Sequence, residues 1–349
     1  MKLNRLYSAT ASILCAVAMA PSLGASAPQD VGALQQAESV ARQIAAEMVR
    51  LCPAAEPGDQ AAFDACRAGL YRGSQFKSSL QDYVLWGRQR DPKVALKDTK
   101  LTQFAPDILA GMYVPLFMFN GRYAVSGPDA AGLYQIRLHT AFRNRLAPGQ
   151  FPYPFWHDAD KWSMYERANQ IILHWDGATE RVKVAQFTVF GSNAPVVASR
   201  SVKPPAFDGQ WRWTDAQGAT QPVVTMFDGL LSPANPYLSQ VDASYRALAL
   251  RLRDNQCFDC HVPSNPDHSK RLVLLQTPVH AASEIKRLMN SVRKDRMPRD
   301  DAGIEQPLDA HAKAALLSDG AAFERVVDLA KGWEASRLSA AMSPPRTAP

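Results

Sequence analysis

The sequence predicts an α+β protein, in which a β-rich N-terminal domain with short leading helices precedes an all-α domain. Three observations predict this class. Apolar and polar residues alternate over 134–139, which is typical of a half-buried strand, and Asp176-Gly177 separates two apolar runs as a hairpin turn does. Beyond Pro236, apolar residues recur instead at spacings of three and four, as they do on one face of a helix.

The composition is that of an ordinary globular protein. Of the 349 residues, 46% are hydrophobic and 21% are charged. These values exclude a disordered chain, a collagen and a disulfide miniprotein, and no apolar stretch is long enough to indicate a multi-span membrane protein. We expect the β-rich domain at residues 28–232 and the all-α domain at residues 233–349, with 343–349 as a disordered tail.

Residues 1–27 have the pattern of a secretory signal peptide. Lys2 and Arg5 form a positive start, residues 6–20 are a short apolar segment, and Ala25-Ser26-Ala27 is a small-x-small cleavage site. Cleavage after Ala27 removes both cations and lowers the formal net charge from +6 to +4, which is too weak to indicate nucleic-acid binding. We therefore expect a periplasmic protein with no transmembrane segment in its mature chain.

The leading helices are predicted together with a disulfide. Residues 31–51 and 63–70 have helical spacing, and Pro and Gly residues lie between them. Cys52 and Cys66 stand on either side of this turn, and cysteines of an exported protein are normally bonded or used as ligands. A Cys52–Cys66 disulfide would close a short loop and stabilise the fold by about 3 kcal/mol.

The segment from about residue 100 to 230 is predicted to consist mostly of strands. Residues 170–175 and 181–190 flank the Asp176-Gly177 turn, and a second candidate hairpin runs from Trp211 to Thr225. The aromatic, proline-rich stretch 151–162 is predicted to be a loop that packs onto the sheet.

We find no catalytic constellation in this β-rich segment, which lacks the common hydrolase, metalloprotease and phosphate-binding motifs. His139, His157 and His174 could converge on a metal with Asp158 or Asp160, but core or loop histidines are the better interpretation. Tryptophans could line a ligand groove, although aromatic residues of a β domain usually fill its core. These tryptophans are Trp156, Trp162, Trp175, Trp211 and Trp213.

The all-α domain is predicted to contain three helices around one motif. They cover residues 239–254, 278–294 and 307–338, and the last has a break near Ser318–Gly320. Cys257-Phe258-Asp259-Cys260-His261 directly follows the first helix and is the C-x-x-C-H attachment pattern of a c-type haem.

The spacing of this motif suits the chemistry of haem attachment. Two thiols reach the two vinyl groups on one edge of the porphyrin, and the next residue brings an imidazole to the iron. A redox dithiol would need a strand–helix context, and a zinc site would need a second Cys/His pair close by. The sequence has neither, so we expect one covalent haem c held by Cys257, Cys260 and His261.

A helix ending in C-x-x-C-H, a further helix, a Met-Pro pair and a closing helix resemble a monohaem c-type cytochrome over roughly residues 238–338. The resemblance implies an all-helical fold around the haem, with His261 as the proximal ligand and Met297 as the distal ligand. The chain departs from the family in lacking a Gly in the helix before the motif and a Gly-Pro after it.

Two histidines compete with Met297 for the distal position. His280 lies at a predicted helix start, nineteen positions after His261, whereas His268 lies only seven positions after it and is poorly placed to reach the opposite face. An iron with a vacant or water-bound distal face is the remaining alternative.

We expect an electron-transfer protein rather than an enzyme. Eight Lys and Arg residues between 262 and 299 would form either a basic rim that steers acidic redox partners or a solvated helix face. Two other functions stay open: a periplasmic oxidoreductase whose N-terminal domain binds a substrate, and a haem-based sensor of small ligands.

Overall fold

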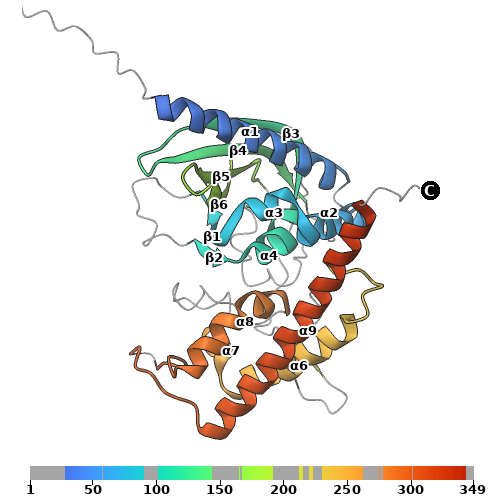
Figure 1. The fold of residues 1–349 in the computed structure, drawn as a ribbon, viewed down its shortest axis with the longest axis vertical. Coiled ribbons are helices and arrows are strands. Elements are labelled where there is room, and N and C mark those ends of the chain that lie inside the picture. The colour runs from blue at the N-terminus through green and yellow to red at the C-terminus, as the bar shows by residue number, and fades with distance from the viewer. Residues whose placement is uncertain are drawn as a thin grey trace, which may run out of the picture.

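The computed structural model describes residues 28–56, 58–89, 101–143, 165, 167–191, 212–214, 220–222, 230–261, 275, 278–300 and 302–342. The described residues up to 222 are built around a sheet and are called the sheet region below. Those from 230 onward are mostly helical and are called the helical region. Figure 1 shows that the long helix α9, drawn in red, runs from one region to the other.

The sheet region begins with three helices, α1 (Pro28–Leu51), α2 (Gln60–Gly73) and α3 (Gln75–Ser79). Asp59 and Ser74 start α2 and α3, because each side chain accepts a hydrogen bond from a backbone N–H in the first turn. α1 lies along β3 and β4 and covers one face of the sheet (Figure 1).

Six strands form a mixed sheet in the order β2-β1-β6-β5-β4-β3. β1 pairs with β6 in parallel, and the other neighbours are antiparallel. The strands are β1 (Leu80–Arg88), β2 (Thr102–Phe104), β3 (Phe117–Ser126), β4 (Leu133–Phe142), β5 (Gln170–Asp176) and β6 (Arg181–Thr188). Between β2 and β3 lie α4 (Pro106–Ile108), the π-helical turn η2 (Leu109–Tyr113) and the 3-10 turn η3 (Val114–Leu116). All seven residues of β5 are buried, so both faces of this strand are covered.

Several predicted strands are confirmed. The alternating stretch 134–139 lies within β4, and β5 and β6 form the hairpin predicted around Asp176, which pairs with Arg181. β7 (Arg212–Thr214) and β8 (Thr220–Pro222) form a separate antiparallel pair within the second predicted hairpin. The predicted loop 151–162 lies outside the described residues.

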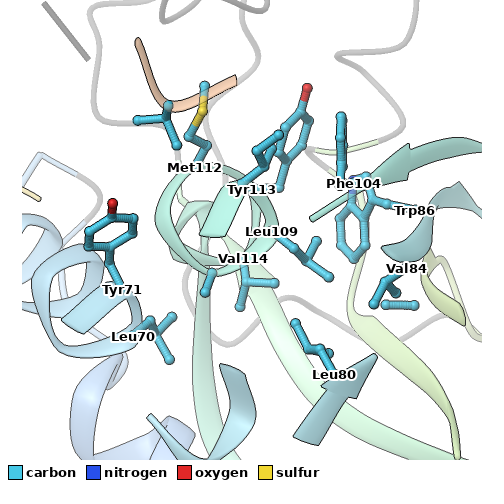
Figure 2. Packing of buried hydrophobic residues seen from close by; sticks show 14 of the residues in the cluster. Leu70, Tyr71, Leu80, Val84, Trp86, Phe104, Leu109, Met112, Tyr113 and Val114 are labelled. Carbon is cyan, nitrogen blue, oxygen red and sulfur yellow. The ribbon is translucent and has the colours of Figure 1, made fainter. Parts of the chain in front are cut away.

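Aromatic and aliphatic side chains from β1, β2, η2 and α2 fill the core beneath the sheet (Figure 2). Trp86 contacts the ring of Tyr113 edge-on at 6.3 Å between centroids, and its indole N–H donates to the hydroxyl of Tyr165 at 3.2 Å. The same cluster of buried residues continues into the helical region, where it includes Tyr245 and Phe323. One apolar interior therefore underlies both regions.

The helical region consists of α6 (Leu238–Asp254), α7 (Cys257–Cys260), α8 (Pro278–Arg293) and α9 (Ala310–Met342). The helices predicted at 239–254 and 278–294 are confirmed to within a residue at either end. Although α9 has 33 residues, neither it nor any other described helix has an apolar stretch long enough to cross a membrane.

The predicted break near Ser318–Gly320 is wrong, because α9 is continuous there. Gly320 is fully enclosed by α8, and a Cβ at this position would lie 2.3 Å from the sulfur of Met289. The glycine therefore serves close packing of two helices and does not interrupt one.

Ionic contacts join α9 to the sheet region. The carboxylate of Asp107 on α4 accepts hydrogen bonds from Lys331 on α9 and forms an ion pair with Lys77 on α3. Glu334, one turn further along α9, accepts from the backbone N–H of Ser232 at 2.6 Å and lies 3.6 Å from the guanidinium of Arg72. The C-terminal half of α9 is thereby held to α2, α3 and α4.

The predicted fold class, a β-rich domain with short leading helices followed by an all-α domain, is wrong. α1 has 24 residues and forms a layer on a mixed sheet. The helical region is not all-α, because Arg299 and Glu305 form an antiparallel β-bridge between α8 and α9 and because α6 lies against β8. Gly303, at φ +80°, turns the chain back between the bridged residues, and helical periodicity carries no signal for such a local pairing.

Candidate haem-attachment site

The candidate site begins where α6 ends. The side chain of Asn255 donates to the carbonyl of Arg251 at 2.8 Å, and Gln256 adopts a left-handed conformation at φ 60°. A left-handed residue ends one helix and lets the chain start another in a new direction. Cys257–Cys260 then form the single turn α7, and the N–H of His261 donates to the carbonyl of Cys257 at 3.0 Å.

The two thiols of α7 are available for chemistry. Cys257 and Cys260 are both half-buried and neither is in a disulfide. Residues three positions apart on a helical turn lie on the same side, so both side chains project from one edge of α7. Burial raises the pKa of Cys257 to about 12, which keeps it protonated at neutral pH. Reactive redox cysteines have lowered pKa values instead.

The other cysteine pair is closed. Cys52 and Cys66 are fully buried and joined by a disulfide, with their Cα atoms 4.7 Å apart. This confirms the pairing predicted from the sequence. The bond ties the end of α1 to the middle of α2.

His261 is half-buried at the end of α7 and is fixed through its backbone. Its carbonyl accepts a hydrogen bond from the N–H of Leu275 at 3.3 Å, and the carbonyl of Leu275 accepts from the hydroxyl of Tyr245 on α6 at 2.9 Å. The chain therefore returns to the motif just before α8 begins. His268 lies outside the described residues.

The two remaining distal candidates have different surroundings. His280 is fully buried in the first turn of α8, with its ring centroid 6.0 Å from that of Phe104 on β2. Met297 is half-buried in the segment between α8 and α9, next to the Arg299–Glu305 bridge. His280 thus belongs to the contact between the two regions, whereas Met297 belongs to a connecting segment of the helical region.

The basic residues near Met297 fall into two groups. Arg287 and Arg299 form ion pairs with Glu284 and Glu305, both at 3.1 Å. Other cations are exposed at the end of α8 and form no ion pair with the described residues; they are Arg293, Lys294 and Arg296.

The structure separates the sheet-region histidines that it describes. His139 is half-buried on β4, where burial and then Arg122 lower its pKa. His174 is buried on β5, and its Nε2 lies 3.0 Å from Oε1 of Gln186. His157, Asp158 and Asp160 lie outside the described residues, and no cluster of three metal-ligating side chains occurs within those that are described.

The predicted tryptophan groove is tested at one position. Trp175 is fully buried, in ring contact with Tyr134, and is a core residue. The side chains of Trp156, Trp162, Trp211 and Trp213 lie outside the described part of the chain.

Sequence analysis missed one buried charge in the helical region. Glu284 on α8 is 1% exposed and accepts a hydrogen bond from Arg287, whose guanidinium lies over the ring of Tyr83 on β1 at 4.7 Å. Burial raises the pKa of Glu284 to about 7, although Arg287 acts in the opposite direction. The available signal was a carboxylate next to Ile285 on the apolar face of a predicted helix.

Comparison of the chain with protein-family models, with curated protein sequences and with solved structures found no match in any of the three.

Proposed function

We propose that this protein carries one covalent haem c and transfers electrons in the periplasm. The observation that carries the proposal is the pair of unbonded thiols of Cys257 and Cys260 on one helical turn, followed directly by His261, in a chain whose other cysteine pair is bonded. This donor set fits the group chemically, because two thiols form the thioether links and an imidazole ligates the iron.

The residues of α7 would divide the work of holding the haem. Cys257 and Cys260 fix the porphyrin edge, and His261 binds the iron through its imidazole. The bound group supplies an iron centre that gains and loses one electron. The backbone contacts from His261 to Leu275 and from Leu275 to Tyr245 restrain the position of the ligand.

We propose Met297 as the distal ligand. To bind iron, His280 would have to leave a fully buried position against Phe104, and this would cost packing energy at the contact between the two regions. Met297 lies in a half-buried connecting segment and has no such contact to lose among those described. A thioether ligand favours the reduced iron and raises the reduction potential.

The proposed location rests on two observations. Residues 1–27, which lie outside the described residues, have the pattern of a signal peptide cleaved after Ala27. The Cys52–Cys66 disulfide supports export, because such bonds persist in oxidising compartments.

The exposed cations at the end of α8 support acidic redox partners. Arg293, Lys294 and Arg296 form no ion pair within the described part of the chain and stand next to Met297 in the sequence. Their charge would speed the encounter with an acidic protein surface, and the effect would weaken as salt increases.

The test is covalent haem attachment followed by spectroscopy. The exported protein, produced with haem-maturation machinery, should retain its haem on a denaturing gel, and the C257S/C260S double variant should retain none. Haem staining that survives both substitutions, or wild-type protein without covalent haem, would overturn the proposal.

The spectrum then identifies the distal ligand. We expect a low-spin ferric spectrum with the weak far-red band of iron–sulfur ligation, and Met297→Ala should convert it towards high spin. A low-spin spectrum that Met297→Ala leaves unchanged would assign the position to His280. A high-spin wild-type spectrum would mean an open iron, and reduction of the haem by an added substrate would then indicate an oxidoreductase.

A further inference from the structure

A buried arginine in the sheet region has almost no hydrogen-bonding partners. Arg143 directly follows β4 and is 1% exposed. Its Nε and Nη1 have no hydrogen-bond partner, and its Nη2 makes only one long contact, 3.4 Å, to the carbonyl of Pro53. Buried polar groups in native proteins are nearly always hydrogen-bonded, so two unpartnered nitrogens on one buried cation require an explanation.

A second poorly satisfied donor lies on the same loop as Pro53. The backbone N–H of Ala55 donates only to the sulfur of Met118, at 3.4 Å. A thioether sulfur is a weak acceptor compared with a carboxylate or phosphate oxygen. Ala55 lies two positions after the carbonyl that Arg143 contacts, so the guanidinium and this amide belong to one neighbourhood at the α1–α2 loop.

Other buried charges of this protein are paired, which sets Arg143 apart. Asp107 is bound by two lysines, and Glu284 is bound by Arg287. No described carboxylate lies within ion-pair distance of Arg143. Burial lowers the pKa of Arg143 and the charge of Asp59 opposes this, but Asp59 uses its side chain to cap α2.

The loop that carries these groups is held in place. The Cys52–Cys66 disulfide ties its two flanking helices together, and the N–H of Phe119 on β3 donates to the carbonyl of Cys52 at 2.9 Å. A guanidinium held in this way is preorganised, because a ligand would not have to order the loop on binding.

We propose that Arg143 and the amide of Ala55 form a binding site for a small oxyanion, the carboxylate or phosphate group of a ligand. An oxyanion supplies the negative charge and the acceptor oxygens that the buried guanidinium lacks. The site lies in the sheet region and is independent of the haem. It gives that region a ligand-binding role of its own.

The test measures thermal unfolding of the full exported chain in an anion-poor buffer at constant ionic strength. Added inorganic phosphate or acetate should raise the wild-type Tm in proportion to the logarithm of its concentration, whereas chloride should not. Whichever of phosphate and acetate acts at the lower concentration identifies the ligand class. A wild-type Tm that neither anion changes would overturn the proposal.

Two substitutions locate the effect. Arg143→Met should weaken the response by about tenfold or more, because it removes charge-assisted hydrogen bonds. It should also raise the Tm in the absence of anion, because an uncompensated buried charge is removed. A purely structural Arg143 would instead lower the Tm when replaced, and an undiminished anion response in Arg143→Met would overturn the proposal.

Asp59→Asn provides a matched variant that keeps the fold. Asn caps helices as well as Asp does, so α2 should be unaffected while one nearby negative charge is lost. The anion response should shift to lower concentration, on the order of threefold. If Arg143→Met does not fold, this variant decides the question, and an unchanged dose response would overturn the site. Because neither measurement uses the haem, failure here leaves the proposed electron-transfer function intact.

Discussion

The two cysteine pairs of this chain divide along its two regions. In the sheet region, Cys52 and Cys66 are fully buried, bonded and fourteen positions apart. In the helical region, Cys257 and Cys260 are half-buried, unbonded and one helical turn apart. The first arrangement closes a loop and stabilises the fold, whereas the second leaves two thiols on one edge of a short helix. The same residue type thus has a structural role in one region and is available to a ligand in the other.

Buried charges differ between the regions in the opposite sense. In the helical region Glu284 is paired with Arg287, and at the contact between the regions Asp107 is held by lysines from α3 and α9. In the sheet region Arg143 is buried with two unpartnered nitrogens. An unpaired buried charge costs several kcal/mol unless something compensates it. The region with closed cysteines is therefore the one that contains an unsatisfied buried cation.

The largest expected effect separates the two cysteine pairs. Replacing Cys52 and Cys66 together by alanine should lower the free energy of unfolding by about 4 kcal/mol, of which about 3 come from loop closure and the rest from lost packing of two buried side chains. Urea unfolding measures the loss, and haem staining should show unchanged covalent attachment. If this variant also lost its covalent haem, the comparison between a structural and a ligand-binding pair would be broken.

The features that the sequence predicted correctly are local ones. The turn at Asp176, the helix before Cys257 and the Cys52–Cys66 pair all depend on residues close together in the chain. The features it did not predict join distant residues. The parallel pairing of β1 with β6 and the contact of Asp107 with Lys331, 224 positions apart, leave no periodic trace in either segment.

The candidate site follows the same rule. The thiols and His261 lie within five consecutive residues, so their chemistry could be predicted from spacing alone. The distal ligand depends on how the chain returns after α8, and the surroundings of His280 and Met297 come from tertiary packing. Arg143 and Glu284 were missed because a lone charge in an apolar segment gives no indication of what it will contact.

The second prediction tests the paired charge of the helical region. The pKa of Glu284 is raised from 4.5 to about 7 in the folded protein, so the folded state retains a proton that the unfolded chain releases. Stability should therefore fall as pH rises from about 4.5 to about 7, by about 3 kcal/mol, and this contribution should be constant above that range.

Glu284→Gln is the matched variant, because glutamine is uncharged at every pH and can still accept from Arg287. Urea unfolding of both proteins over this pH range gives the difference that belongs to Glu284. The variant should gain on the wild type as pH rises. A constant difference would mean that the pair with Arg287 already compensates the burial of the carboxylate.

The third prediction concerns the charges that join the two regions. Burial alone would raise the pKa of Asp107, but Lys331 and Lys77 hold it below its ordinary value. Asp107→Asn leaves both lysines without their carboxylate and should cost about 2 kcal/mol, less than for a fully buried pair because the lysines are partly exposed. Lys331→Met, which leaves the pair with Lys77, should cost less. Equal losses in the two variants would show that α9 is held to the sheet region by apolar packing instead.

The smallest expected effect uses two glycines of α9 as matched probes. At Gly320 a Cβ would meet the sulfur of Met289, whereas at Gly332 no atom lies within 4 Å of the added carbon. Alanine favours a helix over glycine by about 1 kcal/mol, so Gly332→Ala should stabilise the protein by nearly that amount. Gly320→Ala has the same gain in helix propensity but crowds the α8–α9 contact, and we expect a net loss of about 1 kcal/mol. Chemical denaturation of both variants separates propensity from packing within one helix. If both substitutions stabilised the protein, Met289 would be free to move aside, and the close approach of the two helices would not explain the glycine.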